Sequence, residues 1–290
     1  MVIVRLIGGL GNQLFQYALG RRIAYMHNVP LKLDISGFEN YKLHKYSLSH
    51  FNIMAGIASL DDVAPFRDKK GIGGLMSRVV ERFQPYYRRT VVRERFFHFD
   101  PKILKLPRAV YLEGYWQTEK YFNDIDAVIR QELIVKSQPS QVNIAMAERI
   151  GQVPAVSVHI RRGDFISDVD TNRFHGMCSS DYYNMAVEKI AQMVGKPHFF
   201  IFSDDPQWTQ DNLKLKYPVT FVTHNSANED YEDLRLMSLC KYHIIANSTF
   251  SWWGAWLKTA ADKIVLAPRK WFNKPGIDTR DVLPDSWIKL

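Results

Sequence analysis

The chain has 290 residues, of which 46% are hydrophobic and 23% charged, with a formal net charge of +8. This length suits one large domain or two smaller ones, and the hydrophobic share excludes a protein dominated by disorder. The two cysteines, Cys178 and Cys240, are too few for a disulfide framework and lack zinc-ligand spacing. The excess of basic residues favours an anionic partner, such as a nucleotide, a nucleic acid or an acidic membrane surface.

The chain opens with an apolar run over residues 2–7 that predicts a buried strand and ends at Gly8-Gly9. This run is too short for a secretory signal and far below the roughly 20 residues needed to cross a bilayer. No later stretch qualifies either. We therefore expect a cytoplasmic protein.

The following segments predict the opening of a Rossmann-like unit. Apolar residues recur at helical spacing over residues 12–27, and residues 31–34 predict a second short strand. Further on, residues 109–114 predict a strand and residues 119–133 a helix. The region between, residues 60–108, carries no clear motif.

The polar segment 136–141 predicts a linker, after which strands and helices alternate again. The predicted strands are 155–160, 198–202, 219–222, 242–246 and 263–266, and the predicted helices are 182–194, 230–240 and one from about Ser251. This alternation predicts an α/β fold with parallel sheets, in two Rossmann-like halves. Because ligands of such folds bind beyond the carboxyl ends of the strands, functional residues are expected directly after each strand.

The sharpest pattern is His159-Ile160-Arg161-Arg162-Gly163-Asp164, at the end of a predicted strand. Two adjacent arginines at such an edge are costly to bury without an anion, and their planar forks match the geometry of a diphosphate. Asp164 would pair with one guanidinium. The alternative is a surface cluster of salt bridges.

A second pattern, residues 247–256, lies between a strand and a helix, so its hydroxyls fall at a helix N-terminus and predict an anion cradle. On this segment alone, an ordinary N-cap followed by an aromatic core helix is the better interpretation. Its three tryptophans are accordingly expected in the core.

The glycine turn over residues 8–13 lies where a dinucleotide fingerprint would lie, but Leu14 replaces the third glycine. An NAD site is therefore poorly matched. A turn that directs Asn12 and Gln13 into a cleft fits equally well.

Three carboxylates and one acidic triplet complete the candidates. Asp204, with Asp205 at a strand end and Asp233 on the following helix, could accept hydrogen bonds from a guanine edge or could cap a helix. The triplet Asp168-Val169-Asp170 is interpreted as a solvated loop rather than a metal site, since two arginines already neutralise a diphosphate.

Together these motifs resemble the α-1,2-fucosyltransferases, over residues 8–18, 159–165, 202–208 and 247–257, and residues 175–183 are similar to the bacterial branch. The resemblance implies a GT-B fold with two Rossmann-like domains facing across a cleft. Residues 1–140 would take the acceptor and residues 141–290 GDP-fucose. The implied reaction moves L-fucose, with inversion and without metal or other cofactor, to the 2-OH of a terminal galactose on a glycan acceptor, lipid-linked forms included.

The resemblance also implies the site. Arg161 would contact the diphosphate, Asn12 would lie beside the reacting sugar, and Asp164 completes the expected catalytic set. The expected donor-binding residues are Gly11, Gln13, His159, Arg161, Arg162, Asp204, Asp233, Asn247, Ser248, Thr249, Phe250 and Ser251. Asp164, His175 and Asp34 stay open as the base.

Three rival functions fit less well. An NAD-dependent oxidoreductase explains neither the arginine pair nor the second cradle. A basic nucleic-acid-binding protein would need a zinc site, recognition helix or RNA-binding signature, and none is present. A carbohydrate-binding module is usually all-β. The basic, aromatic segment 67–96 predicts peripheral contact with an anionic inner membrane.

Overall fold

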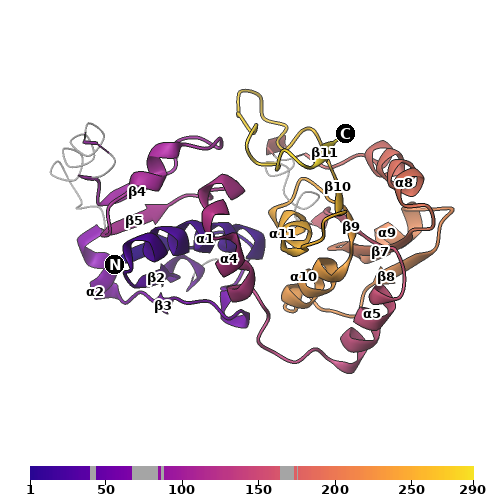
Figure 1. Cartoon of the computed structure of the whole chain (residues 1–290), viewed down its shortest axis with the longest axis horizontal. Helices are drawn as coiled ribbons and strands as arrows, with labels where there is room; N and C mark the ends of the chain where they lie inside the picture. Colours follow the sequence, from indigo (N-terminus) through magenta and orange to yellow (C-terminus); the bar gives the residue numbers. More distant parts are fainter. Residues whose placement is uncertain (40–43, 67–83, 86–87, 164–172, 175) are drawn as a thin grey trace. The chain divides into compact units, whose positions relative to one another are not determined.

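The computed structural model describes residues 1–39, 44–66, 84–85, 88–163, 173–174 and 176–290 (Figure 1). The chain divides into two compact units, Met1–Ile134 with Arg280–Val282 and Val135–Thr279 with Leu283–Leu290. The sequence placed the boundary at residue 140. Each unit holds its own parallel sheet, which confirms the predicted α/β class. The assignment of acceptor and donor to the two halves stays a prediction.

The described part of the N-terminal unit forms a five-stranded sheet in the order β3-β2-β1-β5-β4. Its strands are β1 (Val2–Arg5), β2 (Leu31–Asp34), β3 (Gly56–Ile57), β4 (Val91–Arg93) and β5 (Val110–Glu113). Val2, Ile3 and Val4 are fully buried, as a central strand covered on both faces requires. The strand order reverses between β1 and β5, so the loops after these two strands meet at one edge of the sheet.

Helix α1 (Leu10–His27) packs on this sheet through Gly20, which faces Val4 and Leu31. The predicted helix over residues 119–133 is broken into 3-10 turns, Glu119–Tyr121 and Asn123–Ile125, before α4 (Asp126–Glu132). The break lies at Phe122, whose extended φ of −145° accompanies a fully buried ring that packs 6.2 Å from the ring of Phe15.

The C-terminal unit contains a six-stranded parallel sheet among its described residues, in the order β11-β10-β9-β6-β7-β8. Its strands are β6 (Ala155–Ile160), β7 (His198–Ser203), β8 (Val219–Val222), β9 (Tyr242–Ile244), β10 (Ile264–Ala267) and β11 (Ile288–Lys289). In chain order this is the 3-2-1-4-5-6 arrangement of dinucleotide-binding Rossmann sheets. Here the order reverses between β6 and β9.

Helices cover both faces of this sheet (Figure 1). Helix α8 (Ser180–Val194) packs on the face that carries Val156, Val158 and Ile160. On the other face, α5 (Gln141–Gly151) and α10 (Asp230–Leu239) pack against Phe200 and Phe202. Two further helices, α9 (Pro206–Asn212) and α11 (Thr249–Leu257), follow β7 and β9.

The remaining described elements are short, and the sequence patterns did not predict most of them. They are α2 (Leu60–Val63) and 3-10 turns at Ser36–Glu39, Leu48–His50, Ala64–Phe66 and Pro101–Lys105. The three tryptophans of α11 are at most 3% exposed, as the core interpretation predicts. Across the described ranges, no helix has both the length and the apolarity to cross a membrane. Most of the basic segment 67–96 lies outside the described residues.

The contact between α1 and the sheet yields a test. A Cβ atom on Gly20 would lie 2.3 Å from Cγ2 of Val4, so Gly20→Ala should lower the free energy of unfolding by about 1–3 kcal/mol through overpacking. Urea unfolding measures the change. Gly151→Ala is the control, because no atom lies within 4 Å of its Cβ and α5 should gain slightly. Equal midpoints for Gly20→Ala and the wild type would contradict the close packing.

Candidate active site

The strand order places two predicted motifs side by side. Because β6 and β9 are hydrogen-bonded neighbours, with Val158 opposite Ile244, the residues that follow them share one edge of the sheet. The ring of His159, at the end of β6, lies 5.3 Å from the ring of Phe250 in the first turn of α11. The structure thus brings the arginine motif to the N-terminus of α11, at the point where ligands of such sheets bind.

His159 is 4% exposed, and its Nδ1 atom has no hydrogen-bond partner among the described residues. Burial, with the positive charge of Arg161, lowers the pKa of His159 to about 3, so the ring is neutral at physiological pH. Buried ring nitrogens are normally paired. An unpaired one at a ligand-binding edge is suited to contact a bound molecule.

Arg161 is held by a carboxylate from the next strand. Its Nε lies 3.2 Å from Oδ2 of Asp204, while Oδ1 of the same carboxylate accepts the backbone N–H of Arg162 at 2.8 Å. Both oxygens of Asp204 are therefore engaged by the arginine motif. Asp204 thus orients Arg161, and a guanine contact for Asp204 stays a prediction.

Arg162 lies against α9. Its guanidinium carbon is 3.4 Å from the centroid of the Trp208 ring, and its Nε is 3.5 Å from Oδ2 of Asp205. Asp205 in turn caps α9 by accepting the backbone N–H of Trp208. The helix-capping alternative is thus the correct one for Asp205. The contact between Arg162 and Trp208 was not anticipated, since nothing in the spacing indicates which arginine would stack.

The start of α11 contains one fully buried residue that builds the turn and three that are half-buried. Ser251 is fully buried and bonds the carbonyl oxygens of Ala246 and Ser248. By contrast, Ser248, Thr249 and Phe250 are half-buried, and Ser248 makes no capping bond with its side chain. The backbone N–H groups of this first turn carry the positive end of the helix dipole, which attracts phosphate.

Asp233 lies in the first turn of α10 and accepts a 2.7 Å hydrogen bond from Asn225 through Oδ1. Burial, aided by the negative charges of Asp230 and Glu229, raises the pKa of Asp233 to about 7. A carboxylate with so high a pKa gains from new hydrogen-bond donors, because they stabilise its ionised form.

The N-terminal sheet has a second polar site, after β1 and β5. The Asn12 side chain accepts a 3.0 Å hydrogen bond from Nε2 of Gln117, a buried residue that follows β5. Gln13, in contrast, is fully buried, and among the described residues its side chain bonds only backbone atoms of Gly8, Lys45 and Ser47. The prediction that Gln13 points into a cleft is wrong, because its amide secures the turn. Gly11 is buried in the first turn of α1.

A carboxylate clamp shapes the loop that carries Gln117. Trp116 is fully buried with a φ of +59°, a backbone conformation that is costly for a bulky side chain. Glu94 compensates by accepting the N–H groups of Tyr115 and Trp116 at 2.7 and 2.9 Å. Burial raises the pKa of Glu94 to about 7. This clamp was missed, since no sequence signal connects Glu94 to the loop after β5.

Among the candidate bases, the structure describes only Asp34. It is 4% exposed and accepts hydrogen bonds from the Tyr111 hydroxyl at 2.6 Å and the Ser36 N–H at 3.0 Å. Burial would raise the pKa of Asp34, but these bonds together lower it, so Asp34 is a weak base. Asp164, His175 and the triplet 168–170 lie outside the described residues.

The parts of the chain that the structure describes contain no group of three or more His, Cys, Asp or Glu side chains arranged to hold a metal ion. They do contain two Rossmann-like parallel sheets, and in the second the arginine motif and a helix N-terminus follow the two strands between which the strand order reverses. Two Rossmann-like parallel sheets in one chain are typical of glycosyltransferases with the GT-B fold.

Comparison with known proteins identifies the family. The model of "Glycosyl transferase family 11" matches residues 1–290, and the chain belongs to this family. It is similar to an "Alpha-1,2-colitosyltransferase" of Escherichia coli, with 34% identity over 100% of this chain and 99% of the relative. It is also similar to the "O-antigen biosynthesis glycosyltransferase WbnK" of Escherichia coli, with 33% identity over 98% of this chain and 99% of the relative.

More distant relatives and solved structures are also glycosyltransferases. A "Galactoside 2-alpha-L-fucosyltransferase" of Caenorhabditis elegans is 26% identical over 66% of this chain and 56% of its own. Among solved structures, the α-1,6-fucosyltransferase NodZ soaked with GDP-fucose matches with a TM-score of 0.51 and 14% identity, over 89% of this chain and 92% of that chain. NodZ from Bradyrhizobium gives the same TM-score at 16% identity, again over 89% and 92%. These structures support the GT-B-like fold.

The clamp on the loop after β5 can be tested by stability. Glu94→Ala leaves the N–H groups of Tyr115 and Trp116 without their acceptor, and each such group costs about 1–3 kcal/mol when buried. We expect a lower urea midpoint for Glu94→Ala and a smaller loss for Glu94→Gln, which keeps one acceptor oxygen. Glu39→Ala, at an exposed carboxylate, is the control. If Glu94→Ala and Glu39→Ala unfold alike, the clamp does not hold the loop.

Proposed function

We propose that the chain transfers L-fucose from GDP-fucose to the 2-OH of a terminal galactose, with inversion and without a metal. The observation that supports this most directly is the contact between His159, two residues before the half-buried Arg161, and Phe250 in the first turn of α11, at the ligand-binding edge of a Rossmann sheet. Arg161 and this turn offer guanidinium and backbone N–H donors to a diphosphate. A family member from Caenorhabditis elegans carries the activity in its name.

In this reaction the bond between the anomeric carbon and the β-phosphate oxygen breaks as the galactose hydroxyl attacks from the opposite face. The sugar passes through an oxocarbenium-like state, and negative charge gathers on the departing GDP. Arg161, fixed in advance by Asp204, would meet that charge without reorganising. The acceptor hydroxyl loses its proton, and the group that takes it is unassigned.

The nucleoside would lie on the side of α10. The carboxylate of Asp233 suits the N1–H and N2–H₂ donors of guanine, and the unpaired Nδ1 of His159 suits a further contact with the nucleoside. Asn12, braced by Gln117 at the corresponding edge of the other sheet, would contact the reacting sugar.

The name of one relative points to a second candidate for the sugar donor. The relative with 34% identity over the full chain is named a colitosyltransferase, and colitose differs from fucose only in lacking the 3-hydroxyl. GDP-colitose is therefore the alternative donor. The acceptor would be a galactose-ended glycan of a bacterial surface polysaccharide, since another relative is named for O-antigen biosynthesis.

The central test uses purified protein, GDP-fucose and lactose in EDTA, and follows both GDP release and the sugar product. The wild type should form a fucosylated lactose, and Arg161→Ala should lower kcat by about 10²–10³, the usual effect of removing one preorganised donor. Arg162→Ala is the matched neighbour and should keep kcat close to the wild type, since its guanidinium lies on Trp208.

GDP-colitose is the second arm of the same assay. A higher kcat/KM with GDP-colitose than with GDP-fucose would assign colitose and retain the reaction type. A requirement for added Mg²⁺ or Mn²⁺ would contradict metal independence. No turnover of either donor, with no GDP binding by calorimetry, would overturn the proposal.

The role of Asp233 predicts a pH dependence. A carboxylate that accepts guanine N–H groups must be ionised, and the pKa of Asp233 is about 7, so GDP affinity should fall as the pH drops below 7, by up to about tenfold per unit. Calorimetry between pH 5.5 and 8 measures it. In Asp233→Asn the affinity should be lower and this component of the pH dependence absent, while titration of the GDP phosphate itself affects both proteins equally.

Inosine diphosphate, which lacks the 2-amino group, completes this test. The wild type should prefer GDP by about tenfold or more, the usual contribution of a hydrogen bond to a charged group. An equal preference in Asp233→Asn and the wild type would show that Asp233 does not contact the base.

A further inference from the structure

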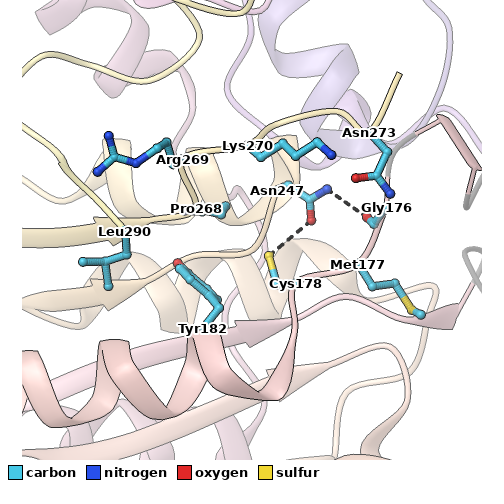
Figure 2. Close-up of a pocket in the computed structure, with 10 residues that line it drawn as sticks. All are labelled: Gly176, Met177, Cys178, Tyr182, Asn247, Pro268, Arg269, Lys270, Asn273 and Leu290. Carbon is cyan, nitrogen blue, oxygen red and sulfur yellow. Dashed lines mark hydrogen bonds between the residues drawn. The ribbon is translucent and has the colours of Figure 1, made fainter. Parts of the chain in front are cut away.

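A separate cavity of about 190 Å³ lies at the same edge of the C-terminal sheet, between the start of α8 and the residues that follow β9 and β10 (Figure 2). Cys178 and Tyr182 form one wall, and Pro268, Arg269 and Lys270 form the other. None of these five residues belongs to the arginine motif or to the first turn of α11. The proposed fucosyl transfer leaves this cavity without a role.

The cavity and the donor site are on opposite faces of the sheet. Tyr182 packs with Val158 and Ile160 on the face covered by α8. Phe250, which contacts His159, packs on the face covered by α5 and α10. A diphosphate bound by Arg161 and α11 would therefore not fill this cavity.

The cavity and the donor site are connected through two consecutive residues, Asn247 and Ser248. The Asn247 side chain lines the cavity, and Ser248 directly after it begins the first turn of α11. Asn247 is 6% exposed and saturated, because its amide donates to the carbonyls of Gly176 and Trp271 at 2.9 and 3.2 Å and accepts from Sγ of Cys178 at 3.4 Å. Figure 2 shows the first and last of these bonds.

Close packing between Gly176 and Asn273 also shapes the cavity. Gly176 has a φ of +71°, and a Cβ atom there would lie 2.2 Å from Nδ2 of Asn273, which also lines the cavity. The positive φ and this close approach both favour glycine at position 176, where the Asn273 amide packs directly against the backbone. A preformed cavity binds its ligand without first ordering its lining side chains.

The charge of the cavity points to an anion. The lining contains no Asp or Glu side chain, and its two charged side chains, Arg269 and Lys270, are exposed cations. The terminal carboxylate of Leu290 is the one anionic group of the lining, and among the described residues neither cation forms an ion pair with it or with any other carboxylate. The Arg269 guanidinium makes one long bond, 3.4 Å to the carbonyl of Lys289, which leaves further donors for a ligand. Guanidinium, ammonium and amide donors together match phosphate oxygens.

We propose that this cavity binds a phosphate or diphosphate group carried by the acceptor. The anionic character follows from the lining residues alone, while the link to the acceptor rests on the proposed function. The donor diphosphate has its own cradle on the other face of the sheet, so the anion in this cavity comes from another molecule. A free inorganic phosphate or pyrophosphate has the same chemistry, and the experiment separates the two sources.

The first arm compares two acceptors that share one galactose-ended disaccharide. One carries a neutral methyl aglycone, and the other a diphosphate ester with a short alkyl chain. We expect a kcat/KM about ten- to a hundredfold higher for the diphosphate, as for hydrogen bonds to a charged group. The double variant Arg269→Ala, Lys270→Ala should lose this preference and keep wild-type activity on the neutral acceptor. Lys196→Ala, at an exposed lysine before β7, should change neither.

The second arm locates binding through Cys178. The other cysteine, Cys240, is fully buried, so iodoacetamide reports on Cys178. Burial raises the pKa of Cys178 to about 11, and the labelling is therefore run near pH 9. With GDP present in excess to fill the donor site, pyrophosphate and the diphosphate acceptor should each slow the alkylation, and the double variant should abolish this protection.

The outcomes are distinct. Protection by both ligands with a preference for the diphosphate acceptor supports the proposal. Protection by pyrophosphate without that preference assigns the cavity to free anions and overturns the link to the acceptor. Absence of protection and of preference overturns the site. If instead neither acceptor is turned over, the proposed function fails, and the alkylation arm still decides whether the cavity binds anions.

Discussion

The reversal of strand order between β6 and β9 is the constraint on which the site depends. Chain segments leaving two neighbouring parallel strands in opposite directions open a crevice at their carboxyl ends, and no helix of the sheet fills it. The arginine motif and the start of α11 directly follow these two strands. The N-terminal sheet repeats the arrangement between β1 and β5, where Asn12 meets Gln117. The strand order thus fixes where both polar sites lie, and the side chains then determine their chemistry.

The charges and pKa values of the residues at this edge of the sheet also suit a bound nucleotide. His159 is kept neutral beside an arginine, and Arg161 is oriented by a carboxylate that its neighbour's backbone also holds. The acidic first turn of α10 carries carboxylates whose pKa values are raised, with Asp230 at about 6 and Asp233 at about 7. Positive and negative groups therefore lie on separate elements of one edge, which matches a ligand with an anionic end and a hydrogen-bond-donating end.

Much of this fold could be predicted from the sequence, because buried parallel strands are short apolar runs bounded by turns. The strands at residues 31–34 and 219–222 have the predicted bounds. What the sequence could not provide is the partner of each polar side chain. Gln13 and Asp204 are residue types that bind ligands or brace loops equally well, and only tertiary contacts decide between these roles. The positive φ of Trp116 has no sequence signal at all, since tryptophan is a poor choice for that conformation.

The saturated amide of Asn247 has a thermodynamic consequence. Its hydrogen bonds tie residues 176 and 178 to the residue that directly precedes Ser248 and the first turn of α11. A molecule that displaces Gly176 or Cys178 therefore also shifts the helix end that faces the opposite side of the sheet. Linkage requires the effect to be reciprocal: whatever factor one ligand imposes on the affinity of the other is returned unchanged. One side chain would then couple the affinities of two ligands that bind on opposite faces of the sheet.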